Sequence, residues 1–123
     1  MKLQKIEHDF SICKLNDISL VDFSDEFCFV GKTDEELSLV CTTSHIPSNT
    51  LQREDGWKAF RVQGELEFSL VGILSAISTL LSENGISIFA VSTYNTDYIL
   101  TKTENFSRAV KILEEAGYQI NKI

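Results

Sequence analysis

The clearest pattern of apolar and polar positions lies in the second half of the chain. Leu66 and Phe68 alternate with acidic residues, which is the pattern of a short half-buried strand. Ser69 follows as the expected N-cap of an amphipathic helix, and Asn84-Gly85 is expected to end it, because glycine readily adopts the left-handed conformation of a helix C-terminus. The apolar positions with helical spacing are Leu70, Ile73, Leu74, Ile77, Leu80 and Leu81.

The residues after this helix predict a hairpin, a second helix and a last strand. Residues 86–91 are β-branched and apolar, Tyr94-Asn95 is expected to form a turn, and residues 97–102 return as the next strand. Thr103 is expected to cap the second helix, whose apolar face is Phe106, Ala109, Val110 and Leu113. The resulting order, β-α-β-β-α-β, is the split-βαβ plan of ferredoxin-like folds, with both helices on the same side of an antiparallel sheet.

The first half of the chain repeats this order less clearly. We expect a strand at residues 10–15, at most a short helix at residues 18–23, a hairpin over residues 27–42 and another strand at residues 57–62. No linker rich in proline, glycine or serine separates the halves, so we expect them to fold as one body. The predicted fold class is therefore α+β, with tandem ferredoxin-like βαββαβ units. The N-terminal unit, spanning residues 8–63, is a degenerate copy of the C-terminal unit, spanning residues 64–123.

Composition excludes several classes of function. The 123 residues carry a formal charge of −7, which repels nucleic acid and anionic membrane surfaces. No apolar run approaches the length of a membrane span and no signal peptide is evident, so we expect a cytoplasmic protein. The three cysteines, Cys13, Cys28 and Cys41, are expected to be buried, reduced thiols. Cys41 and His45 could be half of a zinc site, but the chain has only two histidines, and we expect no metal and no cofactor.

Several residues can each be interpreted in two ways. Gly72 interrupts a helical pattern, either to give a ligand access to the backbone or to let the helix pack closely on the sheet. Ser69 either only caps the helix or also donates its hydroxyl to a bound carboxylate. Asp97 either bonds its own backbone in the turn or accepts a hydrogen bond from an ammonium group. Glu35 and Glu36 form either a solvated acidic turn or a second negative wall of a binding site.

The run that contains these residues resembles the ACT domain, a ligand-binding module that regulates many enzymes of amino-acid metabolism. Ser69-Leu70-Val71-Gly72-Ile73-Leu74 stands where typical ACT domains carry Asp-x-Pro-Gly-x-Leu, with serine replacing aspartate and valine replacing proline. The longer stretch from Gly85 to Leu100, together with Gly56-Trp57-Lys58 and Asp34-Glu35-Glu36, is similar to small stand-alone proteins with two ACT-like halves. It is also similar to the ACT repeats of cellular arginine sensors. The resemblance implies amino-acid binding where two ACT units meet.

The sequence therefore favours a non-catalytic regulatory or sensor protein that binds an amino acid. The expected ligand-binding residues are Ser69, Leu70, Val71, Gly72, Ile73, Thr93, Tyr94, Thr96, Asp97, Glu35 and Glu36. Helix-start N–H groups would hold the carboxylate, and acidic residues would hold the ammonium. We also expect a homo-oligomer, most simply a dimer, and a regulated partner protein. The alternatives are a structural protein–protein interaction module without a small-molecule ligand, and a small enzyme of unrecognised type, although no known catalytic motif is present.

Overall fold

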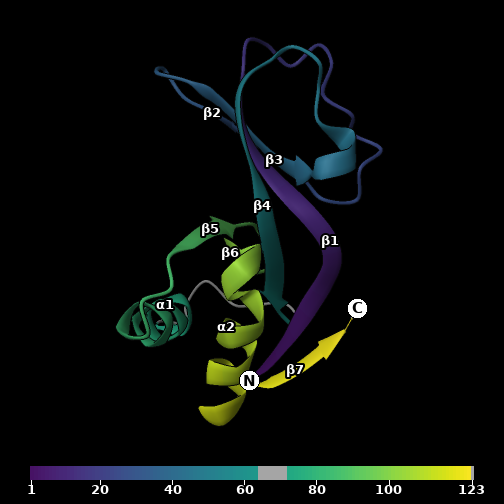
Figure 1. The fold of residues 1–123 in the computed structure, drawn as a ribbon. Helices are drawn as coiled ribbons and strands as arrows, with labels where there is room; N and C mark the ends of the chain where they lie inside the picture. The colour runs from purple at the N-terminus through teal and green to yellow at the C-terminus, as the bar shows by residue number, and fades with distance from the viewer. Residues whose placement is uncertain (64–71, 123) are drawn as a thin grey trace. The chain divides into compact units, whose positions relative to one another are not determined.

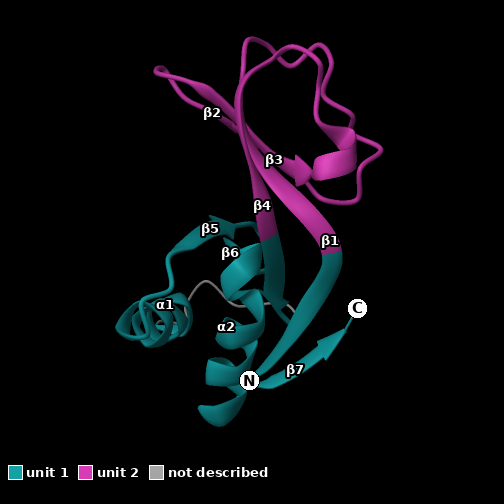
Figure 2. Cartoon of the chain, in the orientation of Figure 1, with its two compact units in different colours: residues 1–7, 58–123 teal, residues 8–57 magenta. Residues whose placement is uncertain are grey.

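A computed structural model describes residues 1–63 and 72–122 (Figure 1). The chain divides into two compact units, which Figure 2 shows in different colours. Unit 1 consists of residues 1–7 and 58–123, and unit 2 consists of residues 8–57. The long strands β1 (Lys2–Leu15) and β4 (Thr50–Val62) contribute residues to both units. No helix among the described residues is long and apolar enough to cross a membrane.

Unit 1 contains the elements that the second half of the sequence predicts. After β4 follow α1 (Ile73–Glu83), β5 (Ile88–Ser92), β6 (Asp97–Lys102), α2 (Thr103–Glu115) and β7 (Gln119–Lys122). The strands are hydrogen-bonded in the order β7-β1-β4-β6-β5. The predicted α+β class, with an antiparallel β5–β6 pair and two helices, is confirmed. The expected strand at residues 66–68 lies outside the described residues.

The N-terminus of the chain adds a strand that the sequence did not predict. Lys2 to Lys5 pair with Gln119 to Lys122 in parallel, so β1 lies between β7 and β4. The expected strand at residues 10–15 thus begins at Lys2. The segment has few apolar residues, but Leu3 is completely buried in the core of unit 1. A strand in a sheet needs backbone partners more than a strong apolar pattern, and here those partners come from the opposite end of the chain.

The core of unit 1 confirms both predicted helical stripes. Ile77 and Leu81 of α1 are buried against the same cluster as Phe106 and Leu113 of α2. The strand residues in that cluster are Leu3, Phe60, Val62 and Ile99, with Ile88 and Ile120 packed against it. Because side chains alternate between the two faces of a strand, all six lie on one face of the sheet. The prediction that both helices cover the same face is confirmed.

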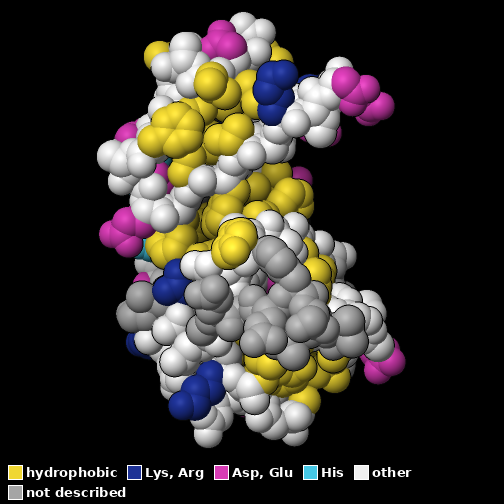
Figure 3. All heavy atoms as spheres, turned by 180° about the vertical axis from the view of Figure 1, so that it is seen from behind, with side chains coloured by type: hydrophobic (Ala, Val, Ile, Leu, Met, Phe, Trp, Pro, Cys, Tyr) yellow, Lys and Arg dark blue, Asp and Glu magenta, His cyan; other side chains and the backbone are white. Residues whose placement is uncertain are grey.

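Unit 2 is built from strands and loops. Its strands are hydrogen-bonded in the order β2-β3-β1-β4, where β2 is Cys28–Lys32 and β3 is Leu37–Thr42, and a short 3-10 helix, η1 (Thr43–His45), follows β3. Residues 8–57 are all described and contain no α-helix, so the predicted tandem of two βαββαβ units is not confirmed. Among the described residues, most of the strongly exposed large apolar side chains belong to this unit, and they are Ile18, Leu20, Phe23, Val30 and Leu51. Figure 3 shows apolar side chains at the surface of the molecule.

Residues 18–23, for which at most a short helix was expected, form turns and no helix. The Asp17 carboxylate accepts a hydrogen bond from the Ser19 N–H at 2.8 Å, and the Asp22 carboxylate accepts one from the Ser24 N–H at 3.0 Å. Aspartate side chains that bond backbone groups two residues ahead stabilise turns at the expense of helix. The aspartates of this segment therefore determine its local structure.

The two hairpins have the same geometry. In each, a four-residue turn is closed by a backbone bond of 2.9 Å, from the Thr33 N–H to the Glu36 carbonyl and from the Thr93 N–H to the Thr96 carbonyl. In each, the first threonine hydroxyl also bonds within the turn. The two turns therefore align Thr33 with Thr93.

The cysteines are free thiols, as expected. Cys28 lies directly opposite Cys41 in the β2–β3 pair, and Cys13 and Cys41 belong to one apolar cluster. Burial raises the pKa of Cys41 to about 12 and also raises the pKa of Cys13. Both thiols therefore stay protonated and unreactive at neutral pH. Cys13 and Cys41 are buried as predicted, while Cys28 is half-buried. Within the described ranges, no group of three or more potential metal ligands is present.

Candidate functional site

The start of α1 differs from the prediction by several residues. The helix begins at Ile73, and its N-cap is Gly72 with a φ of 82°, so the expectation that Ser69 caps this helix is wrong. Ser69, Leu70 and Val71 lie outside the described residues. Gly72 is exposed, and Ile73 packs against the core of unit 1. The expected ligand contact at this turn can therefore be followed only at Gly72 and Ile73.

The backbone conformation of Gly72 explains why a glycine stands there. A Cβ atom added at this position would meet no described atom within 4 Å, so close packing of the helix on the sheet does not require the glycine. Its left-handed φ does, because this conformation is costly for residues that carry a Cβ. Among the described residues, nothing occupies the space beside Gly72, which is compatible with a ligand close to the backbone.

The first turn of α1 also has the electrostatics of an anion site. The Gly72 carbonyl accepts the first bond of the helix, from the Ala76 N–H at 2.8 Å. The N–H groups before Ala76 have no partner within the helix and carry a partial positive charge. The first turn contains no acidic residue, and no side chain caps it. A carboxylate would therefore find hydrogen-bond donors and a favourable potential here.

Substituting Gly72 with alanine should lower the free energy of unfolding by about 1 kcal/mol, because alanine would have to adopt a left-handed φ. Urea denaturation of the full chain measures this loss. Ser75→Ala, at an exposed position of the same helix, is the matched control and should change stability by less than about 0.5 kcal/mol. Equal stability of Gly72→Ala and the unmodified protein would contradict the assigned backbone conformation.

The β5–β6 hairpin holds its two threonines in structural roles. The Thr93 hydroxyl donates to the Thr96 carbonyl at 3.0 Å, and the Thr96 hydroxyl donates to the Val62 carbonyl at 2.9 Å. Thr96 is only 8% exposed, whereas Tyr94 at the tip of the turn is 76% exposed. The bond to Val62 ties the hairpin to the end of β4. Of these three predicted rim residues, Thr93 and Tyr94 are exposed, whereas Thr96 is buried.

Asp97 makes no backbone bond in the turn and has no cationic partner among the described residues. Its carboxylate accepts a hydrogen bond from the hydroxyl of Ser92, its cross-strand neighbour, at 2.7 Å. The Asx-turn interpretation is therefore wrong. The side chain is half-buried, and within residues 1–63 and 72–122 no ion pair neutralises it. A partly desolvated carboxylate without a counter-charge is a favourable partner for an ammonium group.

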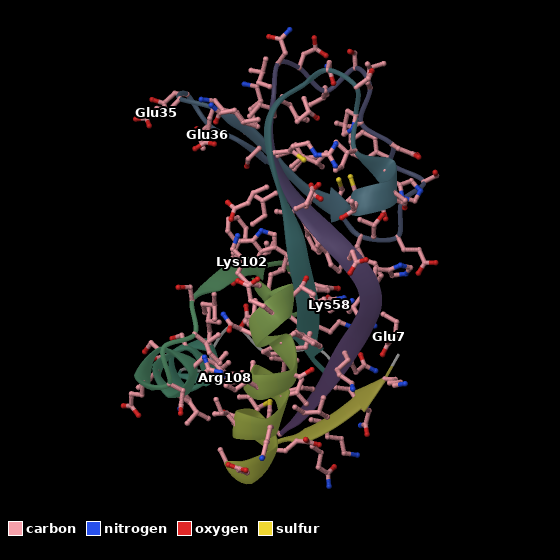
Figure 4. All side chains as sticks on the ribbon, viewed as in Figure 1. Glu7, Glu35, Glu36, Lys58, Lys102 and Arg108 are labelled. Atoms are coloured by element: carbon pink, nitrogen blue, oxygen red, sulfur yellow. The ribbon has the colours of Figure 1, made fainter. Side chains whose placement is uncertain are left out.

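Glu35 and Glu36 lie at the tip of the other hairpin, in unit 2 (Figure 4). Both are exposed, and their N–H groups bond the Thr33 hydroxyl at 3.1 and 3.2 Å. Their backbone is thus occupied in the turn while their carboxylates face solvent. The solvated acidic turn is the simpler interpretation of this arrangement, and a role beside Asp97 stays a prediction.

Sequence reasoning missed an open cavity of about 530 Å³ between α1 and the start of β5. It is lined by Ser78, Thr79, Ser82, Gly85, Ile86, Ser87 and Ile88. The Ser78 and Ser82 hydroxyls donate to carbonyls of their own helix at 3.1 and 3.0 Å, so their protons are already used. None of these lining residues is charged, and the Thr79 and Ser87 hydroxyls can both donate and accept hydrogen bonds. The sequence feature that could have indicated this cavity is the set of hydroxyl residues between the apolar positions of the helix. Serine at such positions usually only faces solvent.

Comparisons with known proteins give a consistent result. The sequence profile of the ACT domain matches residues 52–115. Protein Atu0741 of Agobacterium tumefaciens is 30% identical, with a TM-score of 0.86 over 99% of this chain and 92% of that chain. Protein VC0802 of Vibrio cholerae, of unknown function, is 22% identical, with a TM-score of 0.75 over 90% of this chain and 85% of its own. No curated protein matches the sequence.

The aspartate kinase of Clostridium acetobutylicum, described as an allosteric enzyme, shares the fold. Its TM-score is 0.65 at 16% identity, over 93% of this chain and 33% of the kinase. The similarity therefore concerns one third of a larger enzyme, and at this identity it shows the fold alone.

Proposed function

Because the chain belongs to the ACT domain family, we propose that it is a stand-alone regulatory module that binds a free amino acid. The observation that carries the proposal is the half-buried Asp97 carboxylate, which has a serine hydroxyl but no described cation beside it. The occurrence of a similar fold within an allosteric aspartate kinase supports a regulatory role. In this proposal the module is non-catalytic and acts by shifting between two states, or between partners, when the amino acid binds.

The two ends of the amino acid would be held by opposite charges. The α-carboxylate would accept hydrogen bonds from the N–H groups of Gly72 and Ile73 at the start of α1. The N–H group of Val71 stays a predicted third donor. The α-ammonium would donate to Asp97. Side chains two residues apart on a strand share a face, so Asp97 lies on the same helix-covered face as Ile99, whereas Tyr98 lies on the other face. Neither group requires a metal or a cofactor.

The remaining parts of the proposal concern the unit in which Glu35 and Glu36 lie. That these two glutamates contribute a second negative wall stays a prediction from the sequence, and their negative charge would favour a basic or neutral ligand over an acidic one. Residues 8–63 and 64–123 would be two related halves, a relation supported by the identical turns at Thr33 and Thr93. A homodimer would supply further ACT–ACT contacts.

Asp97→Asn should weaken amino-acid binding at least tenfold, a loss of about 1.4 kcal/mol, because it removes the charge that faces the ammonium while leaving an acceptor for the Ser92 hydroxyl. A thermal-shift panel of the twenty amino acids identifies the ligand, and calorimetry measures its Kd for each variant. Asp34→Asn is the matched control, because it removes the same charge from an exposed turn of the other hairpin. We expect no change in Kd for this control.

Two outcomes would contradict the proposal. If no amino acid raises the Tm of the full chain, the protein is better described as an interaction module without a small-molecule ligand, since a ligand at 100 times its Kd stabilises a fold by about 2.7 kcal/mol. If an amino acid binds equally well to Asp97→Asn, the ammonium is held elsewhere.

A further inference from the structure

Arg61 occupies an unusual position on the face of the unit 1 sheet that is opposite to the helices. It lies between Phe60 and Val62, both of which point into the helix-covered core, so its side chain projects from the other face. Gln4 on β1 and Tyr98 on β6 flank it on the same face, because Leu3 and Ile99 beside them belong to the core. Arg61 is half-buried there.

Two neutral side chains hold the Arg61 guanidinium in one orientation. Its Nε donates to the Gln4 Oε1 at 2.9 Å, and its Nη1 donates to the Tyr98 hydroxyl at 3.2 Å. The Arg61 Cζ also lies 5.9 Å from the centre of the Tyr98 ring. A guanidinium has five N–H donors, so these bonds leave three of them, on Nη1 and Nη2. Those two nitrogens form the fork that binds a carboxylate through two parallel hydrogen bonds.

The other two arginines of the chain have different surroundings. Arg53 binds both carboxylate oxygens of Asp55, at 3.1 and 2.9 Å, so its charge is neutralised. Arg108 donates to the Asn84 carbonyl near the end of α1, at 2.8 Å, and is otherwise exposed. Arg61 is thus the arginine that is both half-buried and, among residues 1–63 and 72–122, without a carboxylate partner. In a chain with eighteen acidic residues and eleven basic ones, this arrangement is unexpected.

The charges on the same face make the contrast stronger. Strand alternation also places Lys2 of β1 and Lys102 of β6 on this face, and Lys102 stands where α2 begins (Figure 4). The described strand positions of unit 1 on this face include no aspartate or glutamate. These positions are Lys2, Gln4, Ile6, Ala59, Arg61, Phe89, Val91, Tyr98, Leu100, Lys102, Gln119 and Asn121. The charged side chains at the described strand positions of this face, Lys2, Arg61 and Lys102, are therefore all positive.

We propose that Arg61, oriented by Gln4 and Tyr98, binds the carboxylate of a small organic acid on this face. The fork geometry favours a planar carboxylate, and the fixed orientation lowers the entropy cost of binding. The site is distinct from the proposed amino-acid site, because Asp97 and its neighbour Tyr98 project from opposite faces of β6. Tyr98 and Gln4 are positioning residues, and the Arg61 guanidinium makes the contact.

The test uses the full chain with sodium succinate as the probe, and neutral succinamide as the control of similar shape. The side-chain N–H resonances of Arg61, assigned by comparison with Arg61→Lys, are followed by NMR at constant ionic strength. Succinate should shift them saturably and succinamide should not. Arg61→Gln should weaken succinate binding at least tenfold, and Tyr98→Phe should weaken it less, because the guanidinium remains but loses one positioning bond. Arg108→Gln, which removes the same charge from an exposed helix position, should leave the Kd unchanged.

Three results would overturn the inference. They are Arg61 resonances that stay unshifted at every concentration of succinate and acetate, an Arg61→Gln variant that binds succinate as tightly as the unmodified protein, and inorganic phosphate that binds more tightly than either carboxylate. Asp97→Asn should leave succinate binding intact, so failure of the amino-acid proposal and failure of this one are distinguishable.

Discussion

Replacing Asp25 with alanine is expected to lower the free energy of unfolding by about 3 kcal/mol, because buried hydrogen bonds to a charged group contribute about 1.5–3 kcal/mol each and its buried partners would lose their acceptor. Asp25 is 7% exposed. One carboxylate oxygen accepts the Phe27 N–H at 3.0 Å, and the other accepts the Thr42 N–H at 3.0 Å and the Thr42 hydroxyl at 2.8 Å. These bonds join the loop before β2 to the end of β3.

Urea denaturation monitored by circular dichroism measures the change. Asp34→Ala is the matched control, since Asp34 is an exposed carboxylate of the β2–β3 turn, and its removal should cost less than about 0.5 kcal/mol. Asp25→Asn should lie between the two, because the amide keeps one acceptor oxygen but loses the charge. A loss below 1 kcal/mol for Asp25→Ala would mean that water replaces the carboxylate and that the loop does not depend on it.

Replacing Phe60 with alanine is expected to cost about 3–5 kcal/mol, the usual loss when a large aromatic side chain is removed from a core. Phe60 is completely buried on β4, and its ring centre lies 6.2 Å from that of Phe106 on α2. The substitution removes the apolar contact between strand and helix and leaves a cavity. The unfolding of α1 and α2, including the start of α1, should therefore lose its cooperativity before the unfolding of the other elements does.

The control for this substitution is Phe23→Ala, which removes the same side chain from a position that is 68% exposed. Its effect should stay within about 0.5 kcal/mol. Hydrogen exchange should show faster opening of α1 and α2 in Phe60→Ala than in Phe23→Ala. Equal stability of the two variants would contradict the assignment of Phe60 to the core of unit 1.

The candidate site was only partly predictable. Gly72 was recognised because a glycine within a helical pattern needs a reason, and Asp97 was recognised because a carboxylate beside a turn has few roles. The cap was assigned to Ser69 because serine is a good N-cap, but the helix begins after a left-handed glycine. Thr96 was expected at the rim of the ligand site, yet its hydroxyl donates to the Val62 carbonyl of another strand. The local sequence pattern does not predict this contact.

The sequence by itself determined the two amphipathic helices and the two hairpins of this protein, because their apolar spacing and turn residues act over a few positions. Only the tertiary structure decided that Lys2 to Lys5 pair with β7, that Asp25 fastens the end of β3, and that Gln4 and Tyr98 orient Arg61. These contacts join residues far apart in the chain. Their partners are chosen by the geometry of the folded sheet, which the spacing of neighbouring residues does not encode.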